Sequence, residues 1–197
     1  MTPQVESVLD VFRATGAYLE GHFRLTSGLH SPHYLQCALV LRHPRTAEDL
    51  GRRLAAELRT IVDEPVALVV SPALGGLIIG HEVARALGTP MLFTERDPET
   101  RQMALRRGFT VHPGDTVVVV EDVITTGGST REVIATLRAA GARVLAAGSI
   151  IDRSGGTADV GVRRVALGTL QVAAHRPDTC PLCREGIPVV KPGSRPA

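Results

Sequence analysis

The sequence is poor in aromatic residues and in lysine. Phe, Tyr and Trp together make up 3% of its 197 residues, and Trp is absent. The buried core must therefore rest on Ala, Val, Leu and Ile. Lys191 is the only lysine among 22 basic residues, so any catalytic cation that precedes it in the chain has to be an arginine.

Cysteine, long apolar runs and net charge are also scarce. Cys37, Cys180 and Cys183 do not make a disulfide framework. Cys180 and Cys183 form a CxxC pair, which we interpret as two thiols in a turn. A zinc site needs about four ligands, and the other candidates are His175 and the distant Cys37, unless a second subunit contributes. No protein-bound metal is therefore predicted.

The ends and the composition exclude further classes. The first residues, MTPQVESVLDVF, lack the basic and apolar regions of a signal peptide. Apolar runs stay below the roughly 18 residues that a membrane span needs. A net charge of +2 does not favour nucleic-acid binding. We expect a cytoplasmic protein that binds neither membrane nor nucleic acid.

Helical and strand patterns alternate along the chain. Residues 3–20 and 45–62 show helical spacing of apolar residues, and Thr46 is the expected N-cap of the second helix. Short apolar runs, each typical of a buried strand, occupy residues 66–70, 91–93, 116–120 and 143–151. Glycine-rich turns and helical stretches follow the first and third runs. The pattern predicts the α/β class, a parallel sheet flanked by helices.

The string VVVVEDVITTGGSTRE, residues 117–132, is the most informative segment. A buried strand ends in Glu121 and Asp122, and the chain then turns through Thr and Gly into a helix. Glycines and a helix N-terminus suit a bound phosphate, and the two carboxylates suit sugar hydroxyls. A plain strand–turn–helix connection with an acidic cap is the alternative reading of such a turn.

The full string resembles the motif by which type I phosphoribosyltransferases bind phosphoribosyl pyrophosphate (PRPP). The resemblance implies a parallel sheet flanked by helices with a small N-terminal/C-terminal hood. It also implies that Glu121 and Asp122 hold the ribose hydroxyls, with Asp122 counted as catalytic. The 5-phosphate would contact Thr125, Thr126, Gly127, Gly128, Ser129 and Thr130.

Two further segments match the pyrophosphate side of this family. The string SPALGG, residues 71–76, stands where the family has its pyrophosphate loop, and the implied contacts are Ala73, Leu74 and Gly75. A non-proline cis peptide is expected between Ala73 and Leu74. A polar loop after residue 93 stands where the family has a mobile, lysine-containing loop. Here Arg96 and Arg106 are the preferred catalytic cations, although either could be an ordinary solvated arginine.

Residues 21–41, GHFRLTSGLHSPHYLQCALVL, resemble the hood of orotate phosphoribosyltransferases. The matching pattern is F-x-L-x-S-G-x-x-S-P-x-Y, although Thr26 stands where a lysine is common. Arg153 follows the fourth strand, where these enzymes have an arginine that pairs with the carboxylate of orotate. The implied orotate contacts are Thr26, Tyr34, Thr125 and Arg153.

The resemblance implies an activity, a cofactor and an assembly. Orotate and PRPP would give orotidine 5-phosphate and pyrophosphate, a step of pyrimidine nucleotide biosynthesis, with Mg²⁺ held mainly by the substrate and with a homodimer as the active form. We expect a single domain, residues 1–197, with a hood at 18–42 plus parts of the C-terminal region, a core at 45–153 and an irregular tail at 176–197. The alternatives are transfer to a purine or another base, and a non-catalytic PRPP-sensing regulator.

Overall fold

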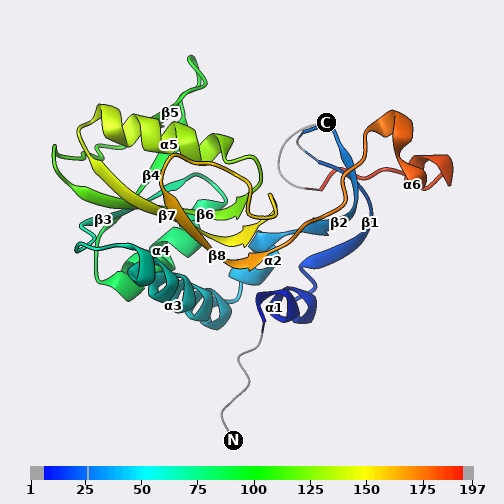
Figure 1. Cartoon of the computed structure of the whole chain (residues 1–197), viewed down its shortest axis with the longest axis horizontal. Coiled ribbons are helices and arrows are strands. Elements are labelled where there is room, and N and C mark those ends of the chain that lie inside the picture. Colours follow the sequence, from blue (N-terminus) through cyan, green and yellow to red (C-terminus); the bar gives the residue numbers. More distant parts are fainter. Residues whose placement is uncertain (1–6, 26, 193–197) are drawn as a thin grey trace, which may run out of the picture. The chain divides into compact units, whose positions relative to one another are not determined.

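The computed structural model describes residues 7–25 and 27–192. They form two compact units (Figure 1). The core unit is Leu41–Leu170, and the terminal unit combines the described parts of Met1–Val40 and Gln171–Ala197. Residues from both ends of the sequence thus share one unit. Among the described helices, none combines the length and the apolar surface that crossing a bilayer requires.

The core unit contains a six-stranded sheet with the strand order β5-β4-β3-β6-β7-β8. All neighbouring pairs are parallel except β4 and β5, which run antiparallel. The strands are β3 (Leu68–Pro72), β4 (Met91–Arg96), β5 (Met103–Leu105), β6 (Thr116–Ile124), β7 (Arg143–Asp152) and β8 (Arg163–Thr169). The predicted parallel sheet is therefore confirmed, and β5 adds a short hairpin inside the segment that was expected to be a polar loop.

Helices cover both faces of this sheet. Figure 1 shows α5 (Gly128–Ala139) on one face and α3 (Pro44–Ile61) with α4 (Gly76–Leu87) on the other. The four consecutive valines of β6, residues 117–120, are fully buried. Val117 and Val119 pack in the cluster that contains Val133 of α5. Because side chains alternate along a strand, the other two valines face the α3–α4 side, and β6 is apolar on both faces.

The terminal unit is built around a hairpin and the C-terminal segment. Strand β1 (Tyr18–Arg24) pairs antiparallel with β2 (His30–Leu35). The C-terminal segment meets both strands through isolated bridges, Phe23 with Val190 and His30 with His175. The helices are α1 (Val8–Ala14), α2 (Cys37–Leu41), the 3-10 helix η1 (Pro177–Thr179) and α6 (Pro181–Arg184). The segment expected to be irregular thus contains two short helical turns.

Two of the predicted helix boundaries are wrong. The first helix ends at Ala14, because Gly16 adopts a left-handed φ of 67° and the chain continues as the extended strand β1. The second begins at Pro44 rather than after Thr46. Proline suits the first helical position, since its missing N–H would have had no helical partner there.

A close approach between α3 and α4 depends on Gly51. A Cβ atom at this position would lie 2.4 Å from the Cβ of Glu82 and 2.8 Å from its backbone carbonyl carbon. Helix propensity alone predicts that Gly51→Ala stabilises the protein by about 1 kcal/mol. Overpacking instead predicts a loss of about 1–3 kcal/mol, and we expect this effect to dominate. Urea unfolding measures the sign, and a stabilised variant would contradict this account of the contact.

Candidate functional site

Four segments follow parallel strands at one edge of the core sheet. They are residues 73–76 after β3, Arg96 at the end of β4, residues 125–130 after β6, and Arg153 after β7. Because β4, β3, β6 and β7 are parallel neighbours, these strand ends share one edge. Ligands of open α/β sheets bind at this edge, and most of the predicted site residues belong to these four segments.

The turn after β6 requires glycine at position 127. Gly127 has a left-handed φ of 74°, and a Cβ atom there would lie 2.7 Å from Cγ1 of Val160. The N–H of Arg131 makes the first bond of α5, 2.9 Å to the carbonyl of Gly127. The N–H groups of residues 128–130 therefore precede the first helical hydrogen bond. Such a helix N-terminus is suited to an anion.

The hydroxyls of this turn serve Glu121. Ser129 Oγ donates to its Oε1 at 2.6 Å, and Thr130 Oγ1 donates to its Oε2. Burial raises the pKa of Glu121, the two hydroxyls oppose that rise, and the neighbouring Asp122 adds to it. We expected these hydroxyls to face a phosphate. Since they donate to the carboxylate, the N–H groups of the turn and the exposed Thr125 and Thr126 remain for an anion.

Asp122 lies against the loop that follows β3. A Cβ atom at Gly75 would lie 2.6 Å from Oδ2 of Asp122, so only glycine allows this approach. The N–H of Val123 donates to Oδ1 at 2.9 Å. Burial raises the pKa of Asp122, although backbone hydrogen bonds partly oppose the effect. Two adjacent carboxylates with raised pKa favour ligands that donate hydrogen bonds or carry positive charge.

The loop after β3 has the predicted backbone. The peptide bond between Ala73 and Leu74 is cis. The N–H of Ala73 donates to the carbonyl of Thr94 at 2.8 Å, which ties the loop to β4. Leu74 is 74% exposed although it is a large apolar residue. The structure therefore brings Ala73, Leu74 and Gly75 to the same edge as Asp122.

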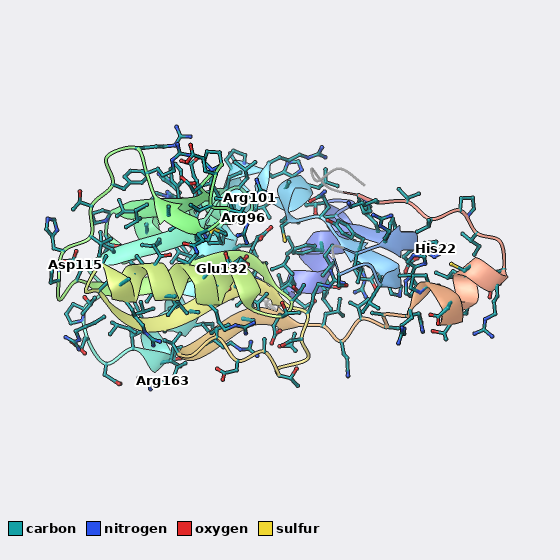
Figure 2. All side chains as sticks on the ribbon, turned by 90° about the horizontal axis from the view of Figure 1, so that it is seen from above. His22, Arg96, Arg101, Asp115, Glu132 and Arg163 are labelled. Carbon is teal, nitrogen blue, oxygen red and sulfur yellow. The ribbon has the colours of Figure 1, made fainter. Side chains whose placement is uncertain are left out.

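The structure places the two candidate catalytic arginines differently. Arg96 forms a bidentate pair with Glu132 of α5, at 2.7 and 3.3 Å, and also donates to the carbonyl of Arg101 at 2.7 Å (Figure 2). Arg106 is exposed in the turn after β5. The neighbouring Arg107 is held by Glu95 through two hydrogen bonds, at 2.6 and 2.8 Å. Arg96 thus has a structural partner in addition to its proposed role.

Arg153 follows a strongly anchored aspartate. Its N–H donates to the carbonyl of Ile124 at 2.7 Å, so the backbone after β7 is tied to β6. Asp152 is 1% exposed and accepts from Arg164 at 2.7 Å and from the Ser154 hydroxyl at 2.6 Å. Burial alone would raise the pKa of Asp152, but the hydrogen bonds from Ser154 and Arg164 outweigh it and lower the pKa.

Thr26 and Tyr34 are the two candidate residues of the hood. Thr26 is outside the described residues. Tyr34 belongs to the terminal unit, where its ring centroid lies 5.9 Å from that of Phe23. Contact of Thr26 and Tyr34 with a substrate stays a prediction.

Sequence reasoning considered a zinc site at Cys180 and Cys183 but did not find the two histidines beside them. His22 and His30 lie beside the CxxC pair in the terminal unit, and all four potential ligand atoms are within 4.8 Å of one another. The CxxC pattern was the available signal. The histidines could not be assigned to it, because about 150 residues separate them from the cysteines along the chain.

Comparison with known proteins identifies the family. A family described as the phosphoribosyl transferase domain matches residues 40–167. This match covers most of the chain and defines its class as a phosphoribosyltransferase. The relatives are more specific. The orotate phosphoribosyltransferase of Pelotomaculum thermopropionicum is 53% identical over 190 residues, 96% of this chain and 97% of the relative. That of Heliobacterium modesticaldum is 55% identical over 190 residues, 96% of this chain and 98% of the relative.

A solved structure supports the same assignment. Orotate phosphoribosyltransferase from Aeropyrum pernix aligns with a TM-score of 0.69 and 29% identity, covering 83% of this chain and 94% of that one. The chain belongs to the orotate phosphoribosyltransferase family of type I phosphoribosyltransferases.

Asp122 and Asp152 should respond to neutralisation with opposite signs. The pKa of Asp122 is higher in the folded protein than in the unfolded chain. As the pH rises above the pKa of the unfolded chain, ionisation of Asp122 therefore lowers the stability of the fold. We therefore expect Asp122→Asn to raise the thermal unfolding midpoint at pH 7, and this gain to vanish below about pH 4.

Asp152→Asn is the matched variant on the adjacent strand. The lowered pKa of Asp152 stabilises the fold above the unfolded pKa, and this contribution is lost as pH falls through the native pKa. We expect a loss of about 1–3 kcal/mol at pH 7, because Arg164 and Ser154 lose a charged acceptor. Thermal unfolding between pH 3 and pH 7 measures both variants. Equal shifts of the same sign would contradict the assignment.

Proposed function

We propose that this protein transfers the 5-phosphoribosyl group from PRPP to orotate, giving orotidine 5-phosphate and pyrophosphate in pyrimidine nucleotide biosynthesis. The observation that carries the proposal is that the loop after β3 and the first turn of α5 both contact the acidic pair of β6. Asp122 lies against Gly75 of the loop after β3, and Glu121 is bound by the first turn of α5. A molecule with a sugar between two phosphate groups matches this arrangement.

Glu121 and Asp122 are proposed to accept hydrogen bonds from the ribose hydroxyls. Each oxygen of Glu121 already accepts one hydroxyl, from Ser129 or Thr130. An ionised carboxylate offers about four lone-pair sites, so both oxygens retain capacity for the sugar. The two hydroxyls also fix the orientation of the Glu121 carboxylate, which reduces the entropy that binding would otherwise cost.

The N-terminus of α5 is proposed to hold the 5-phosphate. The N–H groups of residues 128–130 precede the first helical bond, and Thr125 and Thr126 add exposed hydroxyls. Arg131 fixes this turn by donating to the carbonyl of Thr126 at 3.0 Å. A turn held in place before the ligand arrives needs little rearrangement on binding.

Pyrophosphate is proposed to bind the loop of Ala73, Leu74 and Gly75 and to be neutralised by arginine. Arg106 is exposed in the turn after β5, whereas Arg96 is paired with Glu132. Arg106 can therefore approach an anion without breaking the Arg96–Glu132 ion pair. Arg96 would have to exchange Glu132 for pyrophosphate, so we assign it both the positioning of α5 and a contribution to charge neutralisation. Arginine supplies bidentate hydrogen bonds to phosphate at every accessible pH.

The residues at this edge fit Mg²⁺ as cofactor. Glu121 and Asp122 provide oxygen ligands, which Mg²⁺ prefers, and their raised pKa favours a nearby cation. Mg²⁺ bound mainly by the substrate would neutralise charge on the pyrophosphate as it leaves. The chain itself binds and orients the sugar, and the base nitrogen then displaces pyrophosphate at the anomeric carbon. Positioning and electrostatics supply most of the acceleration.

Orotate specificity is assigned to Arg153, together with Thr26, Tyr34 and Thr125. The backbone of Arg153 is tied to β6, and the preceding Asp152 is held by Arg164 and Ser154. A guanidinium on such an anchored segment suits a carboxylate, which orotate carries and the other common bases lack. We extend the proposal to a cytoplasmic homodimer on the basis of family resemblance.

An assay with five bases tests the substrate. The protein is incubated with PRPP and Mg²⁺ and with orotate, adenine, hypoxanthine, xanthine or uracil, and the nucleotide formed is detected. We expect turnover with orotate alone, abolished by removing Mg²⁺. Turnover of another base instead would keep the phosphate site and refute the assignment of Arg153. PRPP binding without turnover of any base would identify a regulator.

Arg153→Ala should raise the KM for orotate by about 10- to 100-fold, because a charge-assisted hydrogen bond contributes about 1.5–3 kcal/mol. The KM for PRPP should change little. Arg163→Ala is the control, since that arginine is exposed on β8 and pairs with Asp63. A similar rise in both variants would show a general charge effect.

A further inference from the structure

Four side chains with metal-binding atoms gather in the terminal unit, and none of them is among the residues proposed to bind substrate. His22 comes from β1 and His30 from β2, whereas Cys180 and Cys183 flank the start of α6. One ring nitrogen of each histidine and both sulfur atoms lie within 4.8 Å of one another. His22, His30 and Cys180 are buried, and Cys183 is exposed.

The distances match a tetrahedral zinc site. Zn–N and Zn–S bonds of about 2.05 and 2.3 Å at tetrahedral angles separate two nitrogens by about 3.3 Å and a nitrogen from a sulfur by about 3.6 Å. Nε2 of His22 lies 2.9 Å from Nδ1 of His30. It lies 3.6 Å from Sγ of Cys180 and 3.7 Å from Sγ of Cys183. Sγ of Cys183 lies 3.2 Å from Nδ1 of His30, and all four atoms are within 4.8 Å of one another, so small side-chain movements would complete the geometry.

The surroundings of His22 select the nitrogen that would bind metal. Its Nδ1 lies 2.7 Å from the carbonyl of Ile187, an acceptor only, so Nδ1 must carry the proton of the neutral ring. Nε2 then has a free lone pair, and it is the atom that faces the other three groups. A backbone carbonyl that orients a ligating histidine in this way is a common feature of zinc sites.

The backbone brings the two segments together on both sides of the cluster. The N–H of Val190 donates to the carbonyl of His22 at 2.8 Å, and His30 and His175 exchange two hydrogen bonds of 2.8 Å. The cluster is therefore built by ordered main-chain pairing on each flank. Charge also favours zinc, because two thiolates and two neutral imidazoles give a neutral site with a divalent cation, and three of the four ligands are buried.

We propose that the terminal unit binds one Zn²⁺ through His22 Nε2, His30 Nδ1, Cys180 Sγ and Cys183 Sγ. All four coordination positions come from the protein, so the site is structural rather than catalytic. It cross-links the hairpin of β1 and β2 to the C-terminal segment and stabilises the terminal unit. The proposal assigns these four side chains no part in the transfer reaction.

The first test is the metal content of the full chain. The protein is expressed without a histidine tag and purified under reducing conditions without chelator, and its metals are measured by mass spectrometry. We expect about one zinc per chain. A mercurial that blocks thiols should release this zinc in step with the modification of two cysteines.

Variants locate the ligands. Cys183→Ser should lose most of the bound zinc, and the exposed position makes this change tolerable to the fold. His175→Asn is the matched control, because His175 pairs with His30 only through its backbone, and it should keep the full zinc content. Equal zinc content in the wild type and both variants would place the metal elsewhere and overturn the proposal.

Cobalt substitution keeps the proposal testable if a variant fails to fold. Wild-type protein with Co²⁺ in place of zinc should show the visible absorption of a tetrahedral ion and a thiolate charge-transfer band. Removing the metal should lower the thermal unfolding midpoint, and Zn²⁺ should restore it. Two results would refute the site. The reduced wild-type protein would contain no zinc and take up neither ion, or the protein purified under reducing conditions would still hold a Cys180–Cys183 disulfide.

Discussion

Glu121 and Asp122 lie in the last part of strand β6, and the candidate site depends on keeping these carboxylates half-buried. Burial disfavours their charged form. The protein compensates at Glu121 with two hydroxyls and at Asp122 with backbone N–H groups. These hydrogen bonds offset only part of the free energy of desolvating the two carboxylates. Ligands with hydroxyl groups or positive charge would offset more of it, so the pair is suited to bind them.

The same edge of the sheet depends on glycines that allow close approach. Gly75 admits the carboxylate of Asp122, and Gly127 combines a left-handed backbone with contact to Val160. The sheet behind them is packed with aliphatic side chains, and the described core has only one fully buried aromatic ring, Phe12 of the terminal unit. The loops at this edge of the site are therefore held by a closely packed apolar sheet.

Much of the core unit could be predicted from local sequence, because buried strands and glycine-rich turns leave clear patterns. The apolar run of β6 follows from such a pattern, although the strand continues past Glu121 and Asp122 to Ile124, and the cis peptide at Ala73 follows from family resemblance. What failed depends on tertiary contacts. Strand β5 is three residues long and forms only by pairing with β4. The ion pair of Arg96 with Glu132 and the grouping of His22 with Cys180 join residues whose neighbourhood no local pattern encodes.

The division of the chain into units has a consequence for synthesis on the ribosome. The terminal unit draws its strands from the start of the chain and its bridging segment from Gln171 onward, whereas the core unit is continuous. While the core unit is being translated, the β1–β2 hairpin therefore lacks the C-terminal segment that pairs with it. His30 and Phe23 gain their bridging partners only after the core unit has been translated, so removing residues 171–192 would remove part of a structure that begins before the core unit.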